Sequence, residues 1–210
     1  MNSNSISRRL VLCLLAAATA TVALPFRAYA ASNDDPAAVV QSFYDTLLQA
    51  MKGGAQLGFK GRRDLLAPSI EKNFDLPLMT RLTAGLQWQG FSPEDQQNLV
   101  TAFSEYSIAT YANQFDGYSG ERFEVEPAPV KTDGGDDIVK TKLVLPKDDP
   151  VQLDYLMRQE SGGWKIIDVY LSGTISQLAA RRSEFSTVLR NNGVTGLINL
   201  LHQKTAQLAG

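Results

Sequence analysis

The segment that decides the fold is VQLDYLMRQESGGWKIIDVYL, which covers residues 151–171. Two runs rich in aliphatic, aromatic and β-branched side chains flank Ser161-Gly162-Gly163, a sequence typical of a tight turn. This pattern predicts a hairpin with one antiparallel strand on each side of the turn. Shorter runs over 122–126 and 138–145 are bounded by proline, glycine and aspartate, and they predict two more strands. The middle of the chain therefore predicts a four-stranded antiparallel sheet.

Apolar residues at helical spacing precede this segment and predict helices. Three of these helices should begin at Asp34-Asp35-Pro36, at Asp75 and at Ser92-Pro93, where a capping side chain or a first-turn proline stands before an apolar stripe. Gly53-Gly54 should end the first of them, and a shorter helix should follow over about 62–72.

The tail of the chain is also predicted to be helical, with a start at Ser172 or Thr174 and a stop at Asn192-Gly193. Together these elements predict an α+β fold in which N- and C-terminal helices wrap the four-stranded antiparallel sheet. The helices carry more apolar surface than one face of such a sheet can cover. We therefore expect an apolar cavity between sheet and helices, and such a cavity is the usual form of a ligand site.

The first thirty residues have the pattern of an export signal. Arg8 and Arg9 precede an apolar run from Leu10 to Leu24, and this run of 15 residues is too short for a membrane-spanning helix, which needs ~20. Ala28-Tyr29-Ala30 is a cleavage site of the A-x-A kind. The sequence thus predicts a signal peptide over 1–30, a single domain over 31–210, and a periplasmic protein cleaved near Ala30/Ala31.

The composition of the expected mature chain argues against several kinds of chemistry. The only cysteine of the sequence, Cys13, lies in the signal, so the mature chain has no thiol, and His202 is its only histidine. Three of the 20 basic residues and none of the 22 acidic ones lie in residues 1–30, so the mature net charge is −5. Nucleic acid is a poor partner for an acidic chain. We found no nucleophile, phosphate-loop, zinc-protease or dinucleotide motif, so we expect no cofactor and no metal.

Asp168 is the one candidate for a catalytic group. It alternates with Trp164, Ile166 and Tyr170, so a regular strand would place all four side chains on one face. If that face lines the cavity, burial would raise the pKa of Asp168 and could make it a general base. The alternative is that Asp168 pairs with a cation or lies at an open edge.

Arg182 is the cation expected to pair with Asp168. It lies within an apolar stripe made of Ile175, Leu178, Arg182, Phe185 and Leu189, where an unpaired charge would be costly. A role at the mouth of the cavity, in contact with a polar or anionic ligand head, is the other interpretation. Arg181 lies off this stripe and is expected to be solvated.

Several segments in order resemble the MlaC-type (toluene-tolerance) periplasmic lipid-binding family. They are Phe91-Ser92-Pro93-Glu94-Asp95-Gln96-Gln97 with Phe103 and Thr110-Tyr111-Ala112, then Gly163-Trp164-Lys165-Ile166-Ile167-Asp168-Val169, Arg182-x-x-Phe185 and Gly196-Leu197-Ile198. The segments 58–63 and 173–179 resemble the hopanoid-biosynthesis-associated branch (HpnM) most closely. The resemblance covers essentially the whole mature chain.

The resemblance implies an apolar lipid cavity between sheet and helices and a periplasmic carrier for a hopanoid, a phospholipid or another membrane lipid. It also implies exchange of lipid with an inner-membrane ABC transporter whose MCE-domain partner receives it, and an outer-membrane acceptor. It carries over no catalytic set. The candidate lipid-binding residues are Phe74, Leu78, Met79, Leu82, Leu86, Trp88, Phe103, Tyr106, Tyr111, Tyr155, Met157, Trp164, Ile166, Tyr170, Ile175, Leu178, Arg182 and Phe185.

Two other function classes stay open at this point. One is a small cone-shaped α+β enzyme that isomerises or hydrates an apolar substrate, with Asp168 as base and Tyr170 as proton donor. The other is a structural or adaptor protein in which the aromatic residues fill a solid core.

Overall fold

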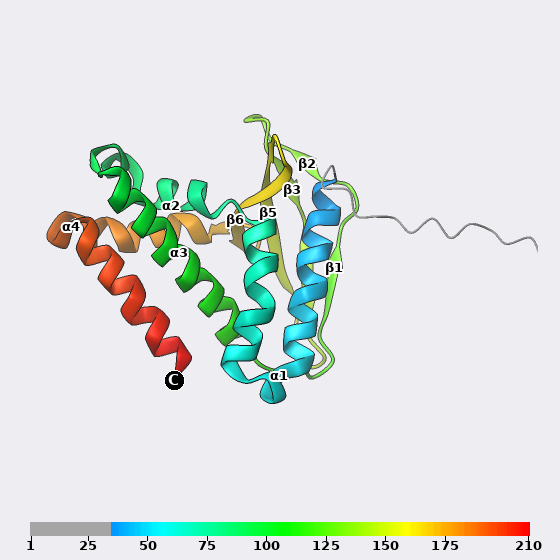
Figure 1. Ribbon diagram of the computed structural model, residues 1–210. Coiled ribbons are helices and arrows are strands. Elements are labelled where there is room, and N and C mark those ends of the chain that lie inside the picture. The colour runs from blue at the N-terminus through cyan, green and yellow to red at the C-terminus, as the bar shows by residue number, and fades with distance from the viewer. Residues whose placement is uncertain (1–34) are drawn as a thin grey trace, which may run out of the picture. The chain divides into compact units, whose positions relative to one another are not determined.

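The computed structural model describes residues 35–210, so the predicted signal peptide and its cleavage site lie outside the described residues. Helices precede and follow an antiparallel sheet, which confirms the α+β class (Figure 1). The helices are α1 (Pro36–Asn73), α2 (Leu76–Ala84), the 3-10 helix η1 (Gly85–Gly90), α3 (Pro93–Gln114) and α4 (Gln177–Ala209). The strands are β1 (Arg122–Val125), β2 (Val130–Lys131), β3 (Asp137–Val139), β4 (Thr141–Val144), β5 (Val151–Glu160), β6 (Gly163–Leu171) and β7 (Ile175–Ser176).

The first helix folds back on itself at two glycines. Gly54 and Gly58 have φ angles of 34° and 60° and leave helical geometry, in the left-handed region that glycine adopts without a steric penalty. Two arms of α1 result, and they run beside each other (Figure 1); the Phe43 ring on the first arm lies 5.0 Å from the Phe74 ring at the end of the second. The break falls where the sequence predicts the end of the first helix.

Side-chain caps start the front helices at the predicted positions. Asp35 accepts a hydrogen bond from the Ala37 N–H, Asp75 from the Leu78 N–H and Ser92 from the Asp95 N–H. The tail helix α4 differs from the prediction, because its cap is Ser176 and not Ser172 or Thr174. Residues 175–176 instead pair with the end of β6 as the short strand β7.

A buried arginine joins the break in α1 to the end of α3. The Arg62 side chain donates from Nε to the Ala112 carbonyl at 2.8 Å and from Nη1 to the Gly54 carbonyl at 2.9 Å. Ala112 lies in the last turn of α3, where carbonyls lack helical partners and the helix dipole is negative. Carbonyl dipoles therefore stabilise the charge of a residue that is only 7% exposed.

Within the described residues the sheet has seven strands, so the predicted number of four is wrong. β5 pairs with β3 and β4 on one side and with β6 on the other. β3 and β4 keep one register against β5 and correspond to the single strand predicted over 138–145, interrupted at Lys140. β2 and β7 have two residues each, which is too short for an alternating pattern to reveal them.

A bulge in β6 changes which of its side chains share a face. Met157 pairs with Ile166 and Leu156 pairs with Asp168, so Ile167 has no partner across the strand pair. Directly paired residues of antiparallel strands point to the same face. The alternation along β6 is therefore shifted by one residue at Ile167.

The expectation that four β6 side chains share one face is wrong as a result. Trp164 and Ile166 lie on the face of Met157, whereas Asp168 and Tyr170 lie on the opposite face, since they pair with Leu156 and Asp154. Beyond the bulge, Val169 and Leu171 take the places on the first face, opposite Tyr155 and Leu153.

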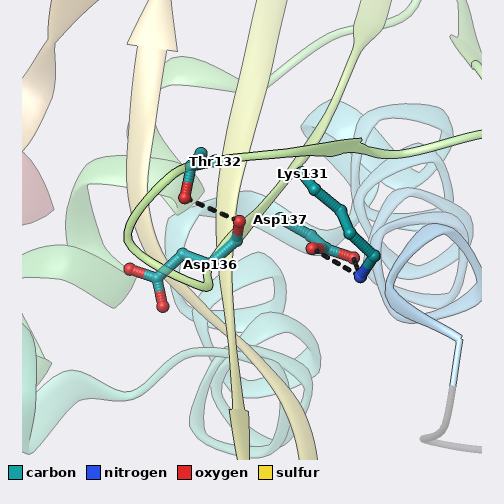
Figure 2. Close-up of polar contacts among 4 residues, drawn as sticks. All are labelled: Lys131, Thr132, Asp136 and Asp137. Carbon is teal, nitrogen blue, oxygen red and sulfur yellow. Dashed lines mark hydrogen bonds and ion pairs between the residues drawn. The ribbon is translucent and has the colours of Figure 1, made fainter.

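The turn between β2 and β3 is closed by polar contacts (Figure 2). The Thr132 hydroxyl donates to the Asp136 carbonyl at 2.8 Å, and the Lys131 ammonium lies 3.2 Å from the Asp137 carboxylate. The Asp136 carboxylate pairs instead with Arg158 at 2.6 Å, and Figure 2 shows the two carboxylates pointing apart. Over residues 35–210 no group of three or more acidic, histidine or cysteine side chains could hold a metal ion. In the same range no helix is long and apolar enough to cross a bilayer.

Replacing Arg62 should destabilise the fold markedly. Arg62→Met keeps much of the buried stem but leaves two carbonyls without their donor, so the free energy of unfolding should fall by about 3 kcal/mol, the scale of hydrogen bonds to a charged group. Urea unfolding followed by circular dichroism measures this loss. Arg63→Met, at the neighbouring and more exposed arginine, is the control and should cost well under 1 kcal/mol, roughly as other surface changes do. Equal losses in both variants would contradict the role given to Arg62.

Candidate functional site

An apolar cavity of about 400 Å³ lies between the sheet and the helices. Its wall is formed by the end of α1, by α2, α3 and α4, and by strands β4, β5 and β6. The apolar and aromatic lining residues are Ile70, Phe74, Leu76, Met79, Tyr111, Phe115, Leu143, Val151, Leu153, Tyr155, Val169, Leu171 and Leu178. The polar ones are Ser107, Thr110, Gln114, Asp168, Gln177 and Arg181. The cavity occurs where the sequence predicts one.

Five rings, from Phe43, Tyr44, Phe74, Tyr111 and Tyr155, form an aromatic cluster on one side of the cavity. Phe74, Tyr111 and Tyr155 line it, and Phe43 lies behind them with its ring centroid 5.0 Å from that of Phe74 and 5.3 Å from that of Tyr111. Tyr44 contacts Tyr155 at 5.5 Å and at 84°. Edge-to-face contacts of this kind fix the rings relative to one another. These contacts support the aromatic wall of the cavity from behind.

Backbone pairing and a buried hydroxyl chain hold this cluster in place. Phe74 forms an isolated bridge with Ile166 on β6, and the Asp75 N–H donates to the Ile166 carbonyl at 2.9 Å. The Tyr44 hydroxyl lies 2.6 Å from the Thr141 hydroxyl, which in turn donates to the Leu153 carbonyl. The ends of α1 and the strands that carry the cavity residues are therefore connected directly.

The tyrosines of the cluster stay neutral over a wide pH range. Burial raises the pKa of Tyr44 to about 12, although its hydrogen bond with Thr141 opposes the shift. Burial is also the main cause that raises the pKa of Tyr111 and the pKa of Tyr155, while the nearby Arg181 opposes the shift for Tyr111. This side of the cavity therefore carries no charge near neutral pH.

The polar lining residues gather on α3 and on the first turns of α4. Ser107, Thr110 and Gln114 are spaced so that they share one face of α3. Gln177 and Arg181 are one helical turn apart on α4. We call these five residues the polar edge of the cavity.

Arg181, and not the predicted Arg182, is the arginine that lines the cavity. Arg181 lines the cavity and is half-buried, with its guanidinium 4.8 Å from the centre of the Tyr106 ring. Arg182 is exposed and packs against Gly85, outside the cavity. Leu178, Arg181 and the buried Phe185 recur at helical spacing and share the inward face of α4, whereas Ile175 lies before the helix in β7 and Arg182 points to the exposed side.

Asp168 does not pair with Arg182, so that prediction is wrong. One Asp168 oxygen accepts the N–H groups of Val169 at 2.7 Å and Leu178 at 3.0 Å, and the other accepts the Ser176 hydroxyl. The carboxylate thus holds β6, β7 and the first turn of α4 together. Tyr170 does not line the cavity, so the base and donor of the enzyme hypothesis are not assembled around a common substrate site.

The candidate residues fall into three groups. Phe74, Met79, Tyr111, Tyr155 and Leu178 line the cavity. Phe103, Met157, Trp164, Ile166 and Phe185 are buried in the core away from it. The third group lies elsewhere, and two of its members, Leu78 and Trp88, line a separate groove beside α2. The others line neither the cavity nor this groove, and they are Leu82, Leu86, which is 90% exposed, Tyr106, Tyr170, Ile175 and Arg182. Lipid binding by any of them stays a prediction.

Sequence reasoning missed several lining residues that a simple pattern marks. Val151, Leu153 and Tyr155 alternate along β5 and all line the cavity. The same strict alternation could have identified the first two. Val169 and Leu171 could not be identified in this way, because the bulge at Ile167 changes their face.

An α+β fold with an apolar cavity between sheet and helices has the usual form of a small-molecule-binding protein. The family model described as "MlaC protein" matches residues 41–203, so this chain belongs to the MlaC family. A solved structure of a phospholipid-binding protein from Ralstonia solanacearum, in complex with a phospholipid, is similar, with 27% sequence identity and a TM-score of 0.73. The match covers 84% of this chain and 99% of that chain. The predicted family is confirmed, and the hopanoid-associated branch stays a prediction.

The fold should lose stability at alkaline pH through its buried tyrosines. In the unfolded chain a tyrosine loses its proton near pH 10, whereas the pKa of Tyr44 in the folded protein is raised to about 12. The stability from keeping this phenol neutral is therefore complete below pH 10 and is lost as the pH rises from 10 to 12, at about 1.4 kcal/mol per pH unit for each such group. Urea unfolding at pH 8 to 12 should show a smaller slope for Tyr44→Phe than for the wild type. Identical slopes would contradict the proposed burial effect.

Asp168→Asn should act on stability, because it removes the charge that accepts hydrogen bonds at the start of α4. We expect a loss of about 1–2 kcal/mol in the free energy of unfolding, the size of a lost charged helix cap. Bound hydrophobic ligand should be retained. The control is Asp149→Asn, at an exposed loop position. A variant as stable as this control would show that Asp168 does not hold the three elements together.

Proposed function

We propose that this chain is a periplasmic lipid carrier that binds one membrane lipid in the apolar cavity. In this proposal it moves the lipid between an inner-membrane ABC transporter, whose MCE-domain partner exchanges lipid with it, and an outer-membrane acceptor. The observation that carries the proposal is the apolar cavity between sheet and helices. Membership of the MlaC family and similarity to a protein solved with a phospholipid support it.

The size of the cavity suits a hydrocarbon chain. A cavity of about 400 Å³ has room for roughly a dozen groups of the volume of a water molecule, ~30 Å³ each. A dozen methylenes moved from water would contribute a gross gain of about 10 kcal/mol, at ~0.8 kcal/mol each. An empty apolar cavity of this size would forgo about the same amount, at ~24 cal/mol per Å³. An apolar ligand therefore offsets the cost of keeping the cavity open.

The cargo in this proposal is a hopanoid or another membrane lipid such as a phospholipid. The segments 58–63 and 173–179 support placement near the hopanoid-associated branch of the family. The export pattern of residues 1–30 supports a periplasmic location, with residues 31–210 as one lipid-binding domain. No catalytic residue is required, because transfer of a lipid breaks no covalent bond.

A bound lipid should be recovered from the purified protein. Organic extraction followed by mass spectrometry, and native mass spectrometry of the intact protein, should both detect about one lipid per chain. Protein that is empty by both methods and takes up no added lipid would contradict the carrier function.

Blocking the cavity should remove this lipid without unfolding the protein. Val169→Trp places a large ring inside the cavity, so bound lipid should fall by at least about tenfold, as loss of a few buried methylenes implies. Val130→Trp is the matched control on β2, where the side chain is 45% exposed and away from the cavity. It should bind as the wild type does. Equal lipid content in the two variants would place the binding site elsewhere.

A further inference from the structure

The cavity contains one cation whose charge has no acidic partner. Among residues 35–210, Arg181 is the only lysine or arginine that lines the cavity, and neither a hydrogen bond nor an ion pair is found for its guanidinium. Other cations near the core are compensated: Arg158 pairs with Asp136, and Lys204 pairs with Glu184 at 2.7 Å. A half-buried and uncompensated charge is costly, and an anionic ligand would remove that cost.

The guanidinium is held in position by aromatic faces. It lies 4.8 Å from the centre of the Tyr106 ring and 5.9 Å from that of Phe103, within the range of cation–π attraction. Tyr106 directly precedes Ser107 and lies one turn before Thr110 on α3. The contact therefore places the charge against α3, the helix that carries three members of the polar edge.

The acidic residue that lines the cavity, Asp168, already has hydrogen-bond partners. Both of its oxygens accept hydrogen bonds, from two backbone N–H groups and from the Ser176 hydroxyl, and no ion pair joins it to Arg181. The Ser107 hydroxyl and the Gln114 amide line the same cavity and add hydrogen-bond donors to it, whereas the Gln177 amide donates to the Ile175 carbonyl.

We propose that Arg181, with the other residues of the polar edge, binds the phosphate of a lipid headgroup, so that the carrier prefers phosphate-bearing lipids to uncharged ones. This inference rests on the proposed carrier function. A guanidinium presents a planar fork of donors that matches two phosphate oxygens. Its contact with Tyr106 limits its freedom before the ligand arrives, which lowers the entropy cost of binding. The hydrocarbon of the lipid lies against the apolar side chains with which β5 and β6 line the cavity.

Lipids with identical chains and different heads test this assignment. Delipidated wild-type protein is titrated with dioleoyl phosphatidylglycerol and with dioleoylglycerol, and binding is measured by native mass spectrometry. We expect about a tenfold preference for the phospholipid, which corresponds to ~1.4 kcal/mol. Arg181→Met should abolish the preference, and Arg181→Lys should retain part of it. Arg182→Met is the matched control at the adjacent, exposed arginine and should retain all of it.

The outcomes separate this inference from the carrier function. If the wild type binds both lipids equally, or if Arg181→Met keeps the full preference, the headgroup assignment is wrong and the carrier function stands. If the wild type binds neither lipid, the headgroup assignment is wrong as well, and the carrier function then depends on the recovery of another lipid, such as a hopanoid, from the purified protein. Since the wild-type comparison alone can overturn the assignment, a variant that does not fold leaves the test intact. Glycerol 3-phosphate should not compete at concentrations where the phospholipid saturates the protein, and competition by it would indicate a free-phosphate site instead.

Discussion

The register shift in β6 is the constraint on which the cavity depends. Ile167 is bulged, so Val169 and Leu171 face the interior beside Tyr155 and Leu153, and Asp168 turns toward the start of α4. Without the bulge, the pattern of β6 would place the carboxylate on the apolar face and Val169 away from it. One extra residue thus turns apolar side chains of β6 toward the cavity and, at the same position, supplies the anchor for α4, which carries Gln177 and Arg181.

The walls of the cavity come from distant parts of the chain, and specific contacts outside the cavity hold each wall in position. The Phe74–Ile166 bridge fixes the end of α1 to the sheet, and Arg62 fixes the break in α1 to the end of α3. Edge-to-face rings support the wall from behind. A well-packed core normally closes around empty space, so an open cavity requires a frame whose elements are tied independently of its contents. These contacts form such a frame.

The sequence predicted the helices and strands better than it predicted which residues line the cavity. Caps such as Asp75 and Ser92 are local signals, and the structure uses both. The bulge at Ile167 depends on pairing between β5 and β6, which no local pattern contains. The choice between Arg181 and Arg182 depends on how α4 packs against α3, because either arginine fits a helical spacing between Leu178 and Phe185. In the structure Arg181 packs against Tyr106 of α3 and lines the cavity, and Arg182 is exposed.

A carrier must discriminate between lipids and still release them. The cavity meets both needs because an apolar lining binds the hydrocarbon and a separate polar edge contacts the headgroup. Burial of hydrocarbon supplies most of the affinity, about 0.8 kcal/mol for each methylene, and is nearly the same for lipids with equal chains. A single half-buried guanidinium adds on the order of 1 kcal/mol, since solvent screens it. That increment is enough to change which lipid is preferred, yet it is small beside the hydrocarbon contribution. Selectivity from Arg181 would therefore change the preference for a headgroup without making release much slower.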